Sequence, residues 1–272
     1  RSVVRDSVPP SPVLSGAFQI PDRSQLVPLP LATLEADFRI PVDIYLDHDG
    51  DWILCRKAGE VLSPEVRREL LEAGQDALWM PLQQRNRYLD YLRSSIQVEW
   101  NPRSRNVWVS DFLEQNSIAQ PQVIESIYRK VHYALLLAHD VGIDGGDLLD
   151  DFCRGMMLLG AQIEGLDLSA LAEEHRSGDS VQDILRGYRE RFDGAGPNGW
   201  SREQQRLPVR IASLVVAFEE ATMGRRNGHE ISLEAAGDLR RCAFDVLRSF
   251  IVDDHGAFDP RLVAGFIRIL ER

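Results

Sequence analysis

Residues 38–46 alternate between apolar and other side chains, and this period of two predicts a half-buried strand. The pair Asp49-Gly50 then predicts a tight turn. Residues 52–56 return as a second strand, so a β-hairpin is expected here.

The whole of residues 31–97 is expected to form a small α/β domain. Ser63 is a suitable N-cap, with proline at the first helical position, and predicts a helix to about residue 73. A third strand is expected over 77–80 and a second helix over 83–95.

Two proline-containing segments suggest how the chain is divided. Residues 1–30 carry prolines at 9, 10, 12, 21, 28 and 30, and are expected to form an extended arm or linker, because proline is poorly tolerated in helices and central strands. The pair Asn101-Pro102 predicts the boundary between residues 31–97 and a second region, 105–272.

From about residue 109 onward, apolar residues recur at spacings of three and four, which is typical of helices with one apolar face. A turn-rich loop is expected over 193–199. The fold class predicted is therefore α+β, a small N-terminal α/β domain followed by an all-helical bundle. The expected helices are 121–138, 147–160, 167–175, 181–191, 208–222, 233–250 and 260–270.

Composition excludes some functions. The 272 residues carry a net charge of -11, which repels phosphate backbones and argues against general nucleic-acid binding. No run of about 18 apolar residues predicts a membrane span, and no apolar leader is present, so a cytoplasmic location is expected. Cys55, Cys153 and Cys242 lack the paired spacing of a zinc site and are expected to be reduced thiols.

Two short motifs have structural explanations. The segment starting at Asp47 resembles a calcium loop, but its glycine comes too early and the twelfth position is Ala58, so a hairpin turn is favoured. The segment from Gly194 to Gly199 fits G-x-G-x-x-G. A dinucleotide site is rejected, because helices are expected on both sides and Pro197 removes a donor.

His132 and His139 lie seven residues apart, on one face of an expected helix. His139 precedes Asp140, and this dipeptide ligates metal in one phosphohydrolase superfamily. Acidic partners at helical spacing are missing from that face. Histidines at the edge of the core are therefore favoured over a metal site.

Four segments of the C-terminal half resemble, in the same order, motifs of the HD-GYP family. Residues 31–92 are also similar to a small accessory domain found ahead of some HD-GYP modules. The four are Arg189–Pro197 for HHE-R-x-D-G-x-G-Y-P, Leu207–Ile211 for I-P-L-x-A-R-I, Phe218–Thr222 with Arg225 for F-D-A-L-T and its following Arg, and Phe258–Val263 for F-D-P-x-L-V.

This resemblance implies a helical domain. Active members hold two or three metal ions, usually iron or manganese, which activate water to cleave cyclic di-GMP. The paired histidines of the family align with Tyr188 and Arg189, and the aspartate of V-A-D-x-F aligns with Val216. The H-D dipeptide aligns with Gly160 and Ala161. Valine cannot ligate a metal and arginine repels one, so the region 105–272 is expected to lack metal ligands.

Glu190 and Asp193 match the family but are too few to build a binuclear site. The sequence therefore predicts a non-catalytic HD-GYP-like module in bacterial cyclic di-GMP-related signalling, with no cofactor. Its expected partner is another protein, contacted through the loop from Asp193 to an exposed Trp200. A second copy of the chain is a further candidate.

Two alternatives stay open. In the first, the chain senses cyclic di-GMP without cleaving it, and Arg191 and Arg225 are the basic groups nearest the phosphates. For both arginines, however, a surface or salt-bridge role is favoured. In the second, His132 and His139 build an unconventional metal-dependent phosphodiesterase.

Overall fold

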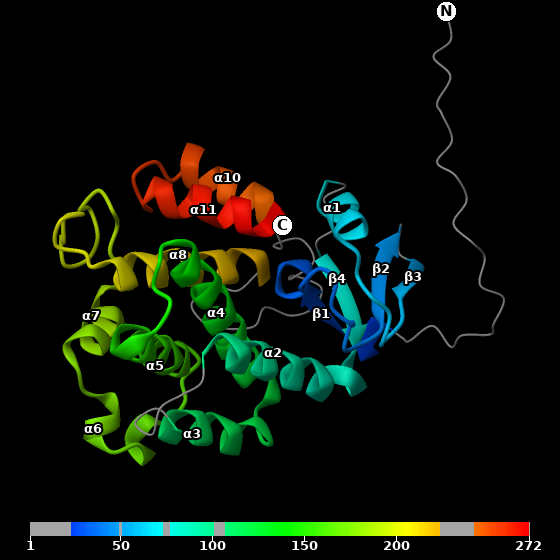
Figure 1. Ribbon diagram of the computed structural model, residues 1–272, viewed down its shortest axis with the longest axis horizontal. Coiled ribbons are helices and arrows are strands. Elements are labelled where there is room, and N and C mark those ends of the chain that lie inside the picture. Colours follow the sequence, from blue (N-terminus) through cyan, green and yellow to red (C-terminus); the bar gives the residue numbers. More distant parts are fainter. Residues whose placement is uncertain (1–22, 49–50, 73–76, 101–106, 224–241, 272) are drawn as a thin grey trace, which may run out of the picture.

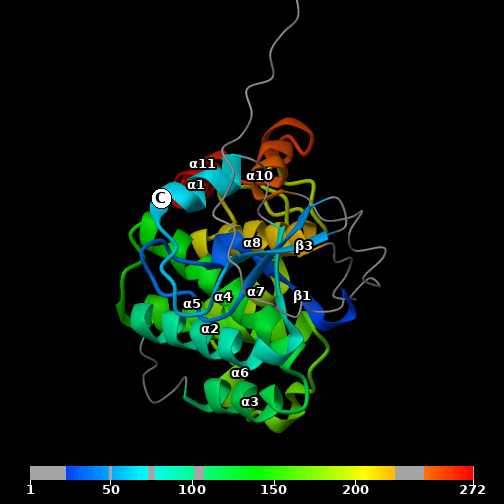
Figure 2. The same ribbon diagram turned by 90° about the vertical axis from the view of Figure 1, so that its right-hand side faces the viewer.

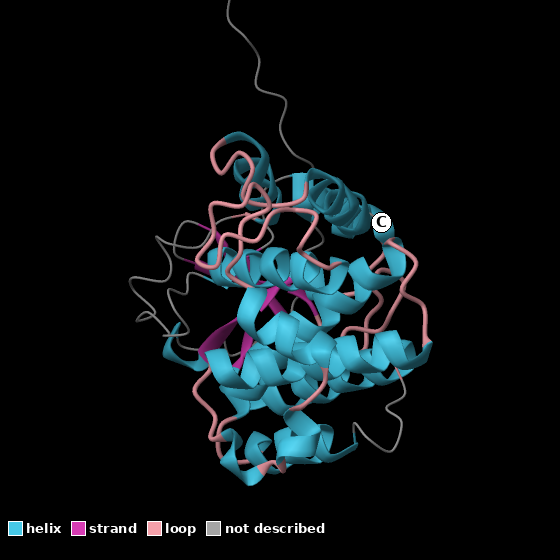
Figure 3. Ribbon diagram, turned by 90° about the vertical axis from the view of Figure 1, so that its left-hand side faces the viewer, coloured by secondary structure: helices cyan, strands magenta, loops and turns pink. Residues whose placement is uncertain are grey.

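The computed structural model describes residues 23–48, 51–72, 77–100, 107–223 and 242–271. A four-stranded antiparallel sheet lies on one side and a bundle of helices on the other (Figure 1). Seen from the bundle side, the strands lie behind the helices (Figure 3). The predicted α+β class is confirmed, with the sheet before the bundle.

The sheet has the strand order β1-β4-β2-β3. β2 and β3 form the predicted hairpin, because His48 pairs with Asp51 across residues 49–50, which lie outside the described residues. The interpretation of this segment as a hairpin is thus confirmed. The strands are β1 (Leu26–Pro30), β2 (Ile44–His48), β3 (Asp51–Arg56) and β4 (Ala77–Pro81).

Two expectations about the sheet are wrong. Residues 26–30 belong to the sheet as β1, not to an arm, and Pro28 is tolerated there because β1 is an edge strand. The strand predicted over 38–46 begins only at Ile44. Before it, Ile40 is still buried, and the chain around it forms only an isolated antiparallel bridge between Arg39 and Val61.

Helices make up the rest of the described chain. Pro64, Pro121 and Pro260 each begin one, because the fixed φ of proline suits a first helical turn. The helices are α1 (Pro64–Glu72), α2 (Arg85–Glu99), α3 (Val107–Ser117), α4 (Pro121–Asp140), α5 (Gly146–Ile163), α6 (Glu173–Arg176), α7 (Asp179–Gly187), α8 (Leu207–Met223), α10 (Ala243–Val252) and α11 (Pro260–Glu271), with short 3-10 turns at Arg23–Gln25, Leu31–Thr33, Leu82–Gln84 and Leu168–Ala170.

Three predicted helices differ from the structure. The helix expected over 167–175 is divided between a 3-10 turn and α6, and the one expected over 181–191 ends at Gly187. Of the helix expected over 233–250, residues 233–241 lie outside the described residues, and α10 begins at Ala243.

Helix α4 is the centre of the molecule. Every side chain from Ile124 to Leu135 is buried, and α4 contacts α2, α5, α8 and α11. One cluster of buried apolar side chains runs from Leu29 in the sheet to Phe266 in α11. The described residues of the sheet region and of the helical bundle therefore share one hydrophobic core.

The ends of the described chain also join the two parts. Helix α11 ends beside α1 (Figure 2). There Arg67 of α1 donates a hydrogen bond to the carbonyl oxygen of Leu270. Among the described residues, no helix is both long and apolar enough to cross a membrane. Cys55 and Cys153 are free thiols.

Candidate functional site

The positions that align with the paired histidines and with the aspartate of V-A-D-x-F meet at one cavity. We call this cavity of about 310 Å³ the α8 cavity. Tyr188 and Arg189 reach it from the end of α7, and Val216 from the middle of α8. Other residues of its wall are Arg191, Glu220 and Phe258.

These residues do not fit a metal centre. Val216 offers no lone pair, and the guanidinium of Arg189 repels a cation. Gly160, which aligns with the histidine of H-D, lies elsewhere: a Cβ there would be 3.0 Å from Cγ2 of Ile127, so it serves close packing of α5 on α4. Within the described part of the chain, no three His, Cys, Asp or Glu side chains are grouped as metal ligands would be.

Glu190, a residue shared with the family motif, holds the following loop. Its side chain is buried, and its carboxylate accepts hydrogen bonds from the backbone N–H of Asn198 at 2.6 Å and of Trp200 at 3.0 Å. A Cβ on Gly196 would lie 2.7 Å from Cα of Glu190, so only glycine fits there. The G-x-G pattern therefore serves to fold the chain around a carboxylate.

Arg191 and Asp193 are paired with each other. Nη2 of Arg191 lies 2.7 Å from Oδ2 of Asp193, and Nε lies 3.2 Å from Oδ1. The hydrogen bond from Arg191 lowers the pKa of Asp193, and the same bond raises the pKa of Arg191. The salt-bridge interpretation of Arg191 is confirmed, whereas Arg225 lies outside the described residues.

Trp200 is half-buried, so the expectation that it is exposed is wrong. Its ring lies against α7: a Cβ on Gly187 would be 2.6 Å from Cζ3 of Trp200 and 2.7 Å from Val209. The large ring fills the space that the missing side chain leaves. The exposed residues of the loop are instead Asp193, Ala195, Pro197, Asn198 and Gly199.

Two further motif segments are joined by an ion pair. Nη1 of Arg210 in α8 lies 3.2 Å from Oδ2 of Asp259, and Oδ1 of Asp259 accepts from the backbone N–H of Arg261 in the first turn of α11. The guanidinium of Arg210 also lies 5.2 Å from the centre of the Phe192 ring. The segments that carry the resemblance therefore lie in contact, and these interactions join them.

Sequence reasoning missed a network of buried charges beside the α8 cavity. Arg129 and Lys130 of α4 are each 1% exposed. Arg129 bonds to Glu125 and lies 2.7 Å from Glu219, whereas Lys130 lies 2.9 Å from Glu164 and 3.2 Å from Glu219. We call this set, together with Arg85 at 3.0 Å from Glu125, the α4 ion network.

The α4 ion network balances its own charge, because it contains three cations and three carboxylates. Burial alone would lower the pKa of Arg129, but the nearby Glu219 and Glu125 outweigh this and raise it. Glu220 connects the network to the cavity: burial raises its pKa, Lys130 opposes this and Glu219 adds to it. The cations that neutralise the carboxylates at this place are thus the protein's own side chains.

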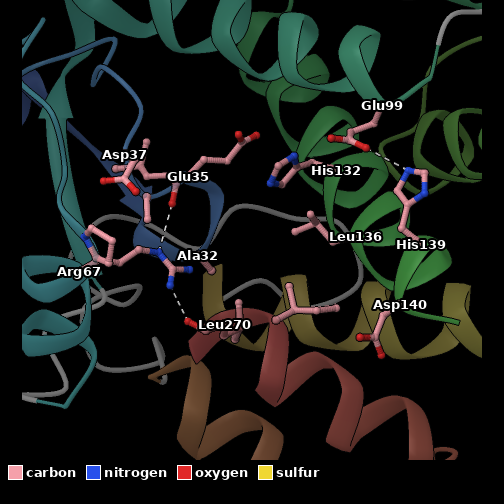
Figure 4. Close-up of a pocket in the computed structure, with 14 residues that line it drawn as sticks. Ala32, Glu35, Asp37, Arg67, Glu99, His132, Leu136, His139, Asp140 and Leu270 are labelled. Carbon is pink, nitrogen blue, oxygen red and sulfur yellow. Dashed lines mark hydrogen bonds and ion pairs between the residues drawn. The ribbon is translucent and has the colours of Figure 1, made fainter. Parts of the chain in front are cut away.

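The two histidines of the alternative metal site lie in a different cleft (Figure 4). His132 is 3% exposed, and its Nδ1 lies 3.3 Å from Oγ of Ser95. His139 has a carboxylate at each ring nitrogen, Glu99 at 3.1 Å from Nε2 and Asp144 at 3.0 Å from Nδ1. The two histidines are therefore held by separate partners.

Comparisons with known proteins add little to what the residues of this chain indicate about its function. No family model and no curated protein matches the chain. Among solved structures, a match is found to Bd1817, an HDG"Y"P protein from Bdellovibrio bacteriovorus, with a TM-score of 0.41 and 13% sequence identity over 91% of this chain and 100% of that chain. Function is therefore inferred from the residues of this chain.

Proposed function

We propose that this chain is a non-catalytic HD-GYP-like module that binds another protein in bacterial cyclic di-GMP-related signalling. The observation that carries the proposal is the composition of the α8 cavity. Where the resemblance requires metal ligands, Tyr188, Arg189 and Val216 form its wall. A hydrolase of this kind needs metal-bound water, and these side chains supply no site for the metal.

The motif residues that remain support a retained scaffold. Glu190 folds the loop, and Arg210 joins α8 to Asp259. These contacts stabilise the arrangement of α7, α8 and α11 without contributing to chemistry. A domain that keeps such contacts and lacks the ligands is suited to binding.

The loop from Asp193 to Trp200 is the proposed contact surface. Its backbone is fixed by Glu190 and Asp193, while the side chain of Pro197 is exposed at its tip. A loop that is ordered before binding loses less conformational entropy when a partner docks. The half-buried Trp200 then acts as its support and not as its anchor.

Replacing Pro197 with glutamate tests this surface. We expect the wild-type chain to retain a specific bacterial protein in affinity capture, and the Pro197→Glu variant to retain about tenfold less, because a charge at the centre of an interface costs more than about 1.4 kcal/mol. Quantitative mass spectrometry measures the difference. Ala119→Glu, an exposed change after α3, is the matched control and leaves retention unchanged. Equal retention by all three chains contradicts a role for the loop.

One observation favours the sensor as the second candidate. The α8 cavity places the Tyr188 ring, with the Arg189 guanidinium 5.2 Å from its centre, beside Arg191. An aromatic ring and basic groups suit a base and a phosphate of cyclic di-GMP. The unconventional phosphodiesterase has less support, because both ring nitrogens of His139 already face carboxylates.

A further inference from the structure

A second, larger cleft lies between the sheet region and the helical bundle. It has a volume of about 570 Å³, within the range of small-molecule sites, and we call it the interface cleft. Its wall combines the chain after β1, the start of α1, the end of α2, one face of α4 and the end of α11. The polar side chains that matter here are Glu35, Arg67, Glu99 and His132 (Figure 4).

One end of the interface cleft accepts hydrogen bonds. Oγ of Ser95 donates to Oε1 of Glu35 at 2.7 Å, so its only proton is used. The contact of 3.3 Å between Ser95 and Nδ1 of His132 then requires Nδ1 to carry the proton and to donate. Nε2 of His132 is therefore left with its lone pair and has no partner among the described residues.

His132 is buried, with 3% of the residue exposed. Its imidazole points into the cleft between the carboxylates of Glu35 and Glu99 (Figure 4). Burial lowers the pKa of His132 to about 4, so the ring is neutral at pH 7. Only one oxygen of Glu35 is occupied, by Ser95. This acceptor end suits a group that donates several hydrogen bonds and carries positive charge.

The other end of the interface cleft donates. Arg67 is 6% exposed, and its guanidinium has no carboxylate partner among the described residues. Nε donates to the carbonyl oxygen of Leu34 at 3.2 Å and Nη1 to that of Leu270 at 2.5 Å. Nη2 has no hydrogen-bond partner in the described part of the chain and points into the cleft (Figure 4). A buried cation that meets only neutral carbonyls favours an anionic partner.

We propose that the interface cleft binds a small zwitterion of the amino-acid class. Its ammonium group would meet Glu35 and Nε2 of His132, and its carboxylate would meet Nη2 of Arg67. An amine alone leaves the arginine without a counter-charge, and a carboxylate alone is repelled by Glu35. A metal ion is disfavoured, because no three ligand side chains are grouped in the described part of the cleft. This site is separate from the α8 cavity and does not depend on its role.

The test is a thermal-shift series on the full chain with L-α-amino acids, β-alanine, 4-aminobutyrate and 5-aminopentanoate, which scan the distance between the two charges. We expect at least one of them, at about 100 times its Kd, to raise Tm by roughly 5 °C. Its amine-only and carboxylate-only analogues, such as butylamine and butyrate for 4-aminobutyrate, produce no such rise. Failure of every zwitterion, or an equal rise with a singly charged analogue, overturns the proposal.

Variants then place the binding in this cleft. Glu35→Gln removes the charge beside His132 and weakens the affinity of the active compound by about tenfold or more, as expected for a charge-assisted hydrogen bond. Asp111→Asn makes the same charge change on the exposed surface of α3 and leaves the affinity as in the wild type. If Glu35→Gln fails to fold, Arg67→Met takes its place, because it removes the cation that would meet the carboxylate of the ligand. Unchanged affinity in the cleft variant contradicts the site.

Discussion

Replacing Arg129 with methionine lowers the free energy of unfolding by about 3–5 kcal/mol, the usual cost of breaking a buried ion pair by removing one partner. The guanidinium is 1% exposed and contacts both Glu125 and Glu219. Without it, Glu219 keeps only Lys130 as a cation of the network, while its carboxylate stays out of reach of water. Urea unfolding of the wild type and the variant measures the difference.

Arg93→Met is the matched control for this experiment. Arg93 also contacts two carboxylates, Glu114 at 2.8 Å and Asp90 at 3.2 Å, but its side chain is 37% exposed. Water replaces those contacts, so we expect a loss of at most about 1 kcal/mol. Similar losses in the two variants would show that burial of the α4 ion network contributes nothing to stability.

Acid destabilises the protein through His132. Its pKa is about 4 in the folded state, against 6.5 for an ordinary histidine, because burial disfavours the charged ring. As pH falls below 6.5, His132 binds a proton in the unfolded chain, whereas in the folded chain it binds one only near pH 4. The free energy of unfolding therefore keeps its full value above pH 6.5. It falls by about 3 kcal/mol between pH 6.5 and 4.

Urea unfolding across this pH range, compared between the wild type and His132→Gln, measures the effect. The variant lacks the titrating group, so its stability falls by about 3 kcal/mol less between pH 6.5 and 4. His255→Gln changes an exposed histidine in the loop after α10 and is expected to follow the wild type. Parallel curves for all three chains would contradict a lowered pKa of His132.

Local patterns were enough to predict much of the fold. The hairpin around residues 49–50 follows from alternation and an Asp-Gly turn, and α4, α8 and α11 begin within one residue of their predicted starts. These elements are determined by short-range signals, which the sequence states directly. Strand β1 was missed because its prolines indicate a linker, and only its position at the sheet edge makes them acceptable.

The buried charges could not be predicted in the same way. Glu125 and Arg129 are four residues apart on α4, a spacing that usually indicates an exposed ion pair. They are buried because α4 is surrounded by other helices, and their partner Glu219 is distant in sequence. Glu125 and Arg129 lie within an unbroken run of buried positions from Ile124 to Leu135. An apolar stripe on one helix face does not predict that the whole circumference of the helix is buried.

The candidate site also has some features that the sequence predicts and others that depend on tertiary packing. The meeting of Tyr188, Arg189 and Val216 at one cavity is what the alignment with the family leads one to expect. The support of Trp200 by Gly187 depends on how α7 and the loop cross, which no local pattern describes. The interface cleft likewise joins residues as far apart as Glu35 and Leu270, and only the shared core brings them together.

A calorimetric titration of the purified chain with cyclic di-GMP, in the presence of manganese or ferrous iron, tests the absence of catalysis most directly when the recovered nucleotide is examined for cleavage. We expect all of the nucleotide to be recovered in its cyclic form. Saturable heat with intact nucleotide would favour the sensor, and no heat would favour the protein-binding module. Linearised dinucleotide in excess over the protein would contradict the proposal. A catalytic metal would then have to bind either at the α8 cavity, where Tyr188, Arg189 and Val216 supply no ligands, or at His132 and His139 in the other cleft.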